Sequence, residues 1–194
     1  RALRVINDDT VEGGGGFPTH PHQNMEIVTF IAEGALEHRD SMGNLGRTEA
    51  GDVQVMSAGT GVTHSEYNQE DTETRLFQIW IIPEERGGEP SWGAKPFPKD
   101  DRSGRFVTLA SGFDGDEDAL PIRTRARVLG ASVKAGETIT YPLGEGRHAY
   151  LVPAKGAVEI DGTRIDARDG VAIKDVDAVE VPALEDSELV MVDA

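Results

Sequence analysis

The hydrophobic residues of this chain fall in short runs separated by turn-forming residues, and no long segment repeats every 3.6 positions. The most apolar runs are residues 26–31 and 76–82, which are rich in β-branched and aromatic side chains and therefore favour strands. Further strands are predicted at residues 2–6, 34–38, 53–56, 127–133, 149–152, 157–160, 171–173, 179–181 and 188–192. This spacing of strands is typical of an all-β sandwich or barrel.

Clusters of glycine, proline and acidic residues between these runs predict turns and connections. Asn7, Asp8 and Asp9 are expected to turn the chain after the first strand, and the four glycines at residues 13–16 to form a mobile loop. Residues 84–105 combine prolines, glycines and charged residues, so we expect this stretch to be the connection between two halves of the chain.

The composition excludes several classes of protein. The net charge of −16 over 194 residues argues against direct binding to nucleic acid, because attraction to phosphate supplies most of the non-specific affinity. The chain has no cysteine, so any metal must be held by histidine and carboxylate side chains. No apolar run approaches the ~20 residues of a membrane span, and no signal segment opens the chain. We therefore expect a cytoplasmic protein that does not bind membranes.

An internal repeat indicates two copies of one β unit. Residues 34–37 (Gly-Ala-Leu-Glu) match residues 156–159 (Gly-Ala-Val-Glu), and a similar run follows each match. The expected domains are residues 1–100, with a metal site, and residues 101–194, without one. An alignment extended without gaps places four positions of the first copy opposite residues that do not bind metal: His20 opposite Pro142, His22 opposite Gly144, His64 opposite Val181 and Glu66 opposite Ala183.

Two clusters, His20-Pro21-His22 and His64-Ser65-Glu66, predict the metal site. Side chains two positions apart on a strand point to the same face of the sheet, so each cluster can aim two ligands at one point. Facing each other inside a barrel, the clusters would supply three imidazoles and one carboxylate. That set suits a divalent first-row metal and leaves coordination positions open.

The spacing leaves alternatives open around this site. Glu26 is a rival carboxylate, because it lies near His22 on a strand that could point inward, and the spacing alone does not decide between Glu26 and Glu66. Asn68 continues the face of His64 and is expected to support the ligands. His38 lies between two charged residues and close to a turn, so it is expected at the surface.

Several long stretches of the chain resemble the pirin family of the cupin superfamily. The resemblance is dense as far as Pro83 and continues more loosely over nearly the whole chain. The stretches that carry it are LRVINDD at residues 3–9, GFPTHPH at 16–22, NMEIVT at 24–29, GALEHRDSMGN at 34–44 and MSAGTGVTHSE at 56–66.

The resemblance implies a bicupin, in which one chain forms two double-stranded β-helix barrels of the jelly-roll type and binds metal in the N-terminal barrel only. It places the iron ligands on His20, His22, His64 and Glu66, which favours Glu66 over Glu26. Fe(II) is the expected metal, with nickel, cobalt, manganese and zinc as alternatives. Members of the family usually carry a segment before Leu3, and its absence from this chain would alter the pocket wall.

Some pirins resemble flavonol dioxygenases, so the expected activity is that of a quercetin 2,3-dioxygenase-type oxidoreductase. Glu66 would act as the catalytic base, and a flavonol and dioxygen would be the substrates. Two alternatives are an iron-containing redox sensor that binds a protein partner as a transcriptional cofactor, and a cupin that acts on another small molecule. No cofactor other than the metal is expected. A monomer is expected, because two barrels in one chain can satisfy the pairing that single cupins achieve by dimerising.

Overall fold

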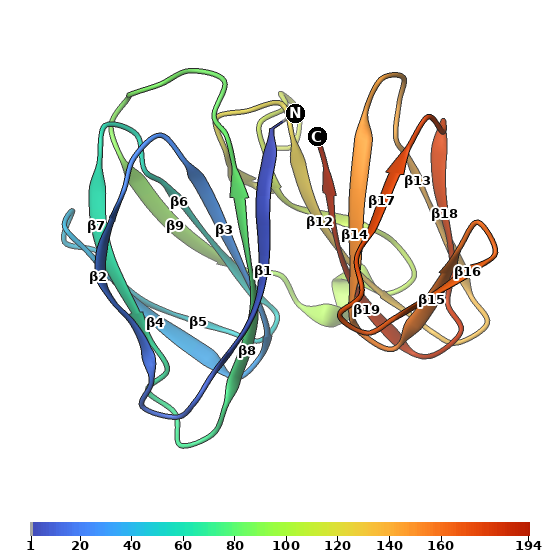
Figure 1. Ribbon diagram of the computed structural model, residues 1–194, viewed down its shortest axis with the longest axis horizontal. Coiled ribbons are helices and arrows are strands. Elements are labelled where there is room, and N and C mark those ends of the chain that lie inside the picture. Colours follow the sequence, from blue (N-terminus) through green and yellow to red (C-terminus); the bar gives the residue numbers. More distant parts are fainter. Residues whose placement is uncertain (1) are drawn as a thin grey trace. The chain divides into compact units, whose positions relative to one another are not determined.

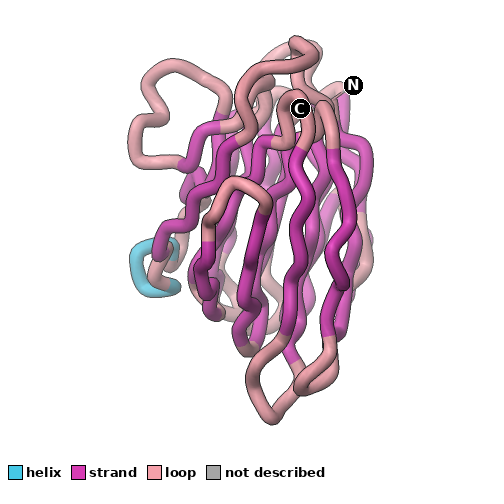
Figure 2. The backbone as a smooth tube through the Cα atoms, turned by 90° about the vertical axis from the view of Figure 1, so that its left-hand side faces the viewer, coloured by secondary structure: helices cyan, strands magenta, loops and turns pink. Residues whose placement is uncertain are grey.

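The computed structural model describes residues 2–194 and consists almost entirely of β-strands (Figure 2). The cyan segment in Figure 2 is a short 3-10 helix, η1 (Lys99–Arg102). The prediction of an all-β fold is therefore confirmed. None of the described residues forms a helix that is both long enough and apolar enough to cross a lipid bilayer.

The chain forms two compact units and passes between them more than once. The first unit comprises the residues up to Phe97 together with Ala110–Arg125, and the second comprises Pro98–Leu109 and Ala126–Ala194. The boundary predicted between residues 100 and 101 lies close to the first of these passages. The segment Ala110–Arg125 then returns to the first unit, so a single cut does not separate the two.

The first unit contains two antiparallel sheets, coloured mainly blue and green in Figure 1. One sheet has the strand order β1-β8-β3-β6-β9 and the other has the order β2-β7-β4-β5. Its strands are β1 (Leu3–Val11), β2 (Gly16–His22), β3 (Glu26–Glu33), β4 (Ala35–Asp40), β5 (Leu45–Glu49), β6 (Asp52–Ser57), β7 (Val62–Tyr67), β8 (Thr74–Ile81), β9 (Ser91–Pro96) and β11 (Leu120–Pro121).

The burial of these strands follows their sequence patterns. β3 and β8 are buried along nearly their whole length, which explains why both read as continuous apolar runs. β7 instead alternates, with Val62, His64 and Glu66 buried and the residues between them more exposed. This alternation turns His64 and Glu66 to the same, inner face of the sheet.

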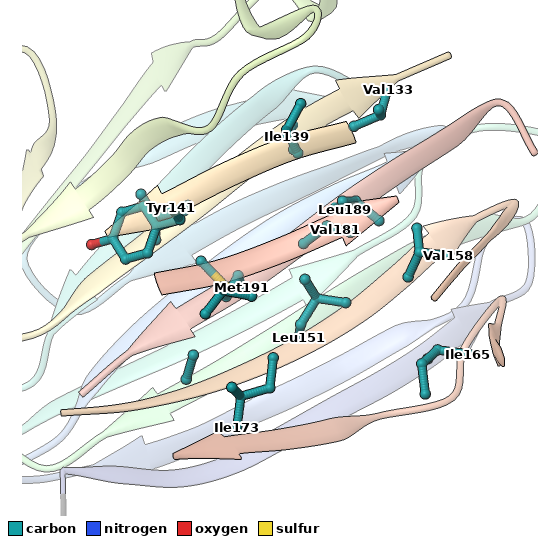
Figure 3. Packing of buried hydrophobic residues seen from close by; sticks show 14 of the residues in the cluster. Val133, Ile139, Tyr141, Leu151, Val158, Ile165, Ile173, Val181, Leu189 and Met191 are labelled. Atoms are coloured by element: carbon teal, nitrogen blue, oxygen red, sulfur yellow. The ribbon is translucent and has the colours of Figure 1, made fainter. Parts of the chain in front are cut away.

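The second unit repeats this arrangement. Its larger sheet has the order β10-β12-β19-β14-β17, and two antiparallel pairs, β13–β18 and β15–β16, complete it. The short strand β11 of the first unit extends this sheet, because it pairs in parallel with the end of β10. Its strands are β10 (Val107–Ser111), which continues into the first unit, β12 (Arg127–Val133), β13 (Thr138–Pro142), β14 (His148–Lys155), β15 (Ala157–Ile160), β16 (Thr163–Asp166), β17 (Val171–Lys174), β18 (Ala178–Pro182) and β19 (Ser187–Asp193). Their inward-facing aliphatic side chains form one core (Figure 3).

One local prediction is wrong. Asn7, Asp8 and Asp9 do not form a turn, because they continue β1 and pair with Gln78, Phe77 and Leu76 of β8. The stretch 84–105, predicted to connect the two halves, contains the passage from the first unit to the second after Phe97, but it also contains β9, which pairs with β6. In both stretches a polar or proline-containing segment becomes a strand by pairing with a partner distant in sequence.

The repeat is present, but the ungapped alignment of its ligand positions is wrong. In the second unit, the isolated bridge between Val158 and Ala183 takes the place of the β4–β7 ladder of the first unit, in which Glu37 pairs with Tyr67. The pair His20–His64 then corresponds to the pair Tyr141–Val179. The counterparts of the four proposed ligands are therefore Tyr141, Leu143, Val179 and Val181, all of them part of the hydrophobic core. These side chains support the prediction that the second unit binds no metal.

Candidate metal centre

Three histidines from β2 and β7 meet inside the first unit. His20 pairs directly with His64 in the ladder between the two strands. One ring nitrogen from each of His20, His22 and His64 lies within 4.8 Å of the others. The ring centroids are 4.5 to 5.0 Å apart. The structure thus brings together three of the four predicted ligands.

The hydrogen bonds of His20 determine which of its nitrogens can bind a metal. Its Nδ1 lies 2.7 Å from the carbonyl oxygen of Pro18, which can only accept, so Nδ1 carries the hydrogen. Its Nε2 is left with a free lone pair and lies 3.0 Å from Nε2 of His64. His22 Nε2 is buried and has no hydrogen-bond partner in the part of the chain that the structure describes.

His38 is completely buried, so the prediction that it lies at the surface is wrong. Its Nε2 donates to the Asp40 carboxylate over 2.8 Å, which leaves the lone pair on Nδ1. That nitrogen lies 3.5 Å from Nδ1 of His64 and can accept its hydrogen. His64 therefore presents the lone pair of Nε2 toward His20. The chain from Asp40 through His38 fixes both the tautomer and the orientation of His64.

Asp40 remains ionised in this chain of hydrogen bonds. Burial alone would raise its pKa, but hydrogen bonds from His38, Asn44 and Met42 outweigh burial and lower the pKa of Asp40. The contact between His38 and Asp40 could have been predicted from the sequence, because the two residues are two positions apart on one strand and therefore point to the same face.

Trp92 of β9 holds His38 in place from the side. The two rings stack with centroids 4.9 Å apart and planes 9° from parallel. The indole also lies against Gly46 of β5, where an added Cβ would come within 2.2 Å of the Trp92 ring. A glycine is therefore required at residue 46 for the indole to reach His38.

The histidine cluster fits a divalent transition metal. Lone pairs of His20 and His64 face each other at 3.0 Å, an arrangement that a cation between or beside them would stabilise. Burial, together with the neighbouring histidines, lowers the pKa of His22 to about 4 and that of His64 to about 3. Both imidazoles are therefore neutral near pH 7, and their nitrogens are suitable ligands for iron, nickel or zinc.

Glu66 lies deep beside this cluster with an exposed fraction of 1%. A carboxylate oxygen of Glu66 lies within 4.8 Å of ring nitrogens of His38 and His64. Its two oxygens accept hydrogen bonds from Gln54 Nε2 at 2.6 Å and from Gln78 Nε2 at 2.9 Å. Burial raises the pKa of Glu66 to about 7, against the smaller lowering effect of these two amides. The sequence did not identify the two glutamines that hold Glu66.

Glu26 and Asn68 make other contacts. Glu26 is buried and accepts hydrogen bonds from Ser57 Oγ at 2.5 Å and from the Arg123 backbone N–H at 3.2 Å. Asn68 donates to the backbone carbonyls of Val11 and Thr72. Asn68 thus secures the loop after β7, and none of its recorded hydrogen bonds reaches a histidine of the cluster.

Replacing His38 should weaken metal binding without removing a ligand. In His38→Phe the ring can still stack on Trp92, but His64 loses the acceptor that fixes its tautomer. We expect metal affinity to fall about 10- to 100-fold, the usual effect of removing an outer-shell partner. A competition titration with a chromophoric chelator would measure it. His38→Asn, whose side-chain oxygen can take the place of Nδ1, should retain more affinity, and equal affinity in both variants would contradict this role.

The raised pKa of Glu66 predicts how the stability of the metal-free protein depends on pH. In the unfolded chain the pKa of Glu66 has its ordinary value of 4.5. Between about pH 4.5 and 7 the folded protein therefore binds the Glu66 proton more tightly than the unfolded chain does. The stabilisation that this proton provides is complete below pH 4.5 and is lost as the pH rises through 7. Denaturant unfolding of wild type and Glu66→Gln, with chelator present, would isolate the effect. The difference in unfolding free energy should change by up to about 3 kcal/mol over this range; a constant difference would contradict the burial argument.

Comparison with known proteins agrees with this geometry. The pirin family model matches residues 1–81, and the family model described as a quercetinase C-terminal cupin domain matches residues 108–194. The bacterial pirin YhhW from Escherichia coli, solved in complex with nickel(II), superposes on this chain with a TM-score of 0.91. It is 39% identical, and the alignment covers 99% of this chain and 82% of that chain. The prediction of a bicupin fold is therefore confirmed.

Two curated relatives are similar over nearly the whole chain. A pirin-like protein from Caulobacter vibrioides is 64% identical over 193 residues, which span 100% of this chain and 83% of the relative. A protein from Escherichia coli named quercetin 2,3-dioxygenase is 41% identical, and the match covers 99% of this chain and 82% of that protein. Family models match both halves, and these relatives are similar over nearly the whole of this chain, so the chain belongs to the pirin family.

Proposed function

We propose that this chain is a metal-dependent dioxygenase that cleaves a flavonol such as quercetin with dioxygen. The observation that carries the proposal is the cluster of three histidines, of which His22 and His64 are neutral near pH 7, beside a buried carboxylate of raised pKa. The identity with the Escherichia coli protein named quercetin 2,3-dioxygenase supports the choice of substrate. The nickel(II) complex of the bacterial pirin YhhW supports the presence of a metal.

The proposed metal ligands are His20, His22, His64 and Glu66, and Fe(II) is the proposed metal, with nickel as the first alternative. When bound, the metal would act as a Lewis acid that stabilises the deprotonated hydroxyl of the flavonol. The protein residues supply the orientation. Pro18 fixes the ring of His20, and the Asp40–His38 pair fixes the ring of His64, so both Nε2 atoms point into the same space.

Glu66 is proposed as the base that takes the proton of the flavonol 3-hydroxyl. A base works best when its pKa is close to the working pH, and burial brings the pKa of Glu66 to about 7. Gln54 and Gln78 each occupy one lone pair of the two carboxylate oxygens, which leaves a lone pair on each oxygen for the proton. Trp80 donates to the Gln78 side-chain oxygen, so the Gln78 amide is turned with its N–H toward Glu66.

A surface pocket of about 590 Å³ reaches the edge of the cluster at His22. Its volume is within the range of small-molecule sites. Trp80 stands edge-on to the His22 ring at 5.0 Å and limits access from one side. The residues that line the pocket are Pro21, His22, Gln23, Ser41, Thr60, Gly61, Val62 and Thr63. We propose that a flat flavonol approaches the metal from this side.

Metal analysis combined with a flavonol assay tests this function. The protein would be purified without added metal, analysed for metal content, and mixed with quercetin first without and then with oxygen. One metal per chain and oxygen-dependent bleaching, with release of carbon monoxide as the ring opens, would support the proposal. Stoichiometric metal without bleaching would contradict the substrate and direct attention to another small molecule or to redox sensing. Absence of metal would contradict the four-ligand site itself.

A further inference from the structure

Glu66 is held by two amide side chains that come from the other sheet of the first unit. Gln54 of β6 and Gln78 of β8 lie on either side of Thr29 in β3, and both pair with Thr29 in the ladders of that sheet. Residues that pair in this way point to the same face. The Nε2 atoms of the two glutamines each reach one oxygen of the Glu66 carboxylate, at 2.6 and 2.9 Å. The carboxylate is thus clamped between two amides.

An amide can hold a carboxylate only when its nitrogen faces the carboxylate. An ionised carboxylate only accepts hydrogen bonds, whereas a glutamine side chain carries a donor NH₂ group beside an acceptor oxygen. A donor that binds the amide oxygen from behind therefore keeps the NH₂ group turned toward Glu66. Each of the two glutamines has such a donor.

For Gln78 the donor is the indole of Trp80, and for Gln54 it is a hydroxyl. Trp80 Nε1, which can only donate, lies 3.0 Å from the Gln78 side-chain oxygen. Thr48 Oγ1 donates to the Gln54 side-chain oxygen over 3.1 Å. Thr48 is the buried residue of β5, whose other residues are more exposed. Two different strands thus turn the two amides in the same way.

The contact between Thr48 and Gln54 is the more deeply buried of the two. Thr48 is completely buried and Gln54 has an exposed fraction of 2%, so water has little access to either side chain. Within residues 2–194, Thr48 is the recorded donor to the Gln54 side-chain oxygen. Without that hydroxyl the oxygen would be buried and unpaired, which costs more than one hydrogen bond contributes. We expect Gln54 then to turn toward another donor and away from Glu66.

We propose that Thr48 is a positioning residue for Glu66, which it holds in place through the side chain of Gln54. The proposal rests on the role of Glu66 as the base proposed above. The side chain of Thr48 is recorded in a hydrogen bond with Gln54, so its effect on Glu66 is indirect. A carboxylate held at both oxygens keeps its remaining lone pairs in a fixed direction. Release of one oxygen would let the carboxylate rotate away from the proton that it is to accept.

The side-chain amides of the glutamines give a direct measurement of this contact. The chain has four glutamines, of which Gln54 and Gln78 are buried and Gln23 and Gln69 are exposed. Their amide groups would be isotopically labelled in the full-length, metal-free protein and followed by NMR at about pH 8.5, where Glu66 is ionised. We expect slow hydrogen exchange with solvent for the two buried amides and fast exchange for the two exposed ones.

Thr48→Val tests the proposal, because valine has the shape of threonine and lacks the hydroxyl. Exchange of the Gln54 amide should become about tenfold faster, while that of Gln78 should not change. The NMR signal of the Glu66 carboxyl carbon, identified by its absence from Glu66→Gln, should shift. Thr48→Ser, which keeps a hydroxyl, should restore both properties.

Thr74→Val is the matched control for this variant. Thr74 is also completely buried in the first unit, but its hydroxyl bonds the backbone of Ala35. The control should leave the Gln54 amide and the Glu66 carboxyl carbon unchanged. No change in Thr48→Val, or equal changes in Thr48→Val and Thr74→Val, would overturn the proposal.

Turnover separates positioning from general support of the fold. In protein reloaded with metal, Thr48→Val should lower kcat for quercetin about two- to tenfold without changing KM, and Thr48→Ser should recover it. An unchanged kcat in Thr48→Val, or an equal loss in Thr74→Val, would overturn the proposal. Absence of turnover in the wild type would contradict the proposed function instead. The NMR measurement, which requires neither metal nor substrate, would still decide whether Thr48 positions Glu66.

Discussion

Replacing His64 with alanine should abolish stoichiometric metal binding and, with it, oxygen-dependent cleavage of quercetin. His64 occupies the centre of the site, because its Nε2 faces His20 while its Nδ1 is held by His38. Removing it therefore deletes a ligand and separates the other two histidines from their support. The loss of affinity should exceed the roughly 100-fold upper range for residues that only support a ligand. Metal analysis after dialysis, together with a chelator titration, measures it.

His148→Ala is the matched control for that variant. His148 begins β14 in the second unit, where it is half-buried, and it should have no part in metal binding. We expect its metal content and activity to equal those of the wild type. Full metal occupancy in His64→Ala would show that the three-histidine site is not the metal site, and loss of metal in both variants would show that the second unit contributes.

Glu66→Gln should retain part of the metal and lose most of the turnover. The amide has nearly the shape of the carboxylate and can stay between Gln54 and Gln78, but it cannot accept the flavonol proton. Loss of a positioned general base lowers the rate constant by about 10²- to 10⁴-fold, so kcat should fall in this range in protein reloaded with metal. Wild-type turnover in this variant would remove Glu66 from the role of base.

Glu26→Gln distinguishes the two carboxylates that the spacing left open. Glu26 is as deeply buried as Glu66, but its Oε2 accepts hydrogen bonds from Ser57 Oγ and from the Arg123 backbone N–H, outside the histidine cluster. This variant should keep its metal and its kcat. If Glu26→Gln lost activity while Glu66→Gln kept it, Glu26 would be the functional carboxylate and the assignment taken from the family resemblance would be wrong.

The grouping of the proposed ligands in two pairs was predictable because it depends on local geometry. Strand alternation places His20 with His22, and His64 with Glu66, whatever the rest of the chain does. The strands around 26–31 and 76–82 were equally predictable, because their side chains are β-branched or aromatic throughout. The pairing of β2 with β7 is the long-range contact that joins the two clusters, and the sequence analysis assumed it when it placed them facing each other inside a barrel.

The support around the ligands was not predictable, because it depends on contacts between segments distant in sequence. Burial of His38 requires Trp92, which lies on a strand that exists only through its pairing with β6. Likewise, Gln54 and Gln78 reach Glu66 from β6 and β8. The alignment of the repeat failed in register because the connections between consecutive strands differ in length in the two units, and an ungapped alignment cannot represent that.

A ribosome that has released the chain only as far as residue 100 holds a first unit that is still incomplete. The segment Ala110–Arg125 supplies β11, which contacts β6 and β9, and the Arg123 backbone N–H that bonds Glu26. At ordinary rates of synthesis these residues follow roughly one to five seconds later. During that interval the nascent chain lacks the contacts of β11 with β6 and β9, and Glu26 lacks the backbone N–H of Arg123. The metal-binding half therefore reaches its final form only while the second half is already being made.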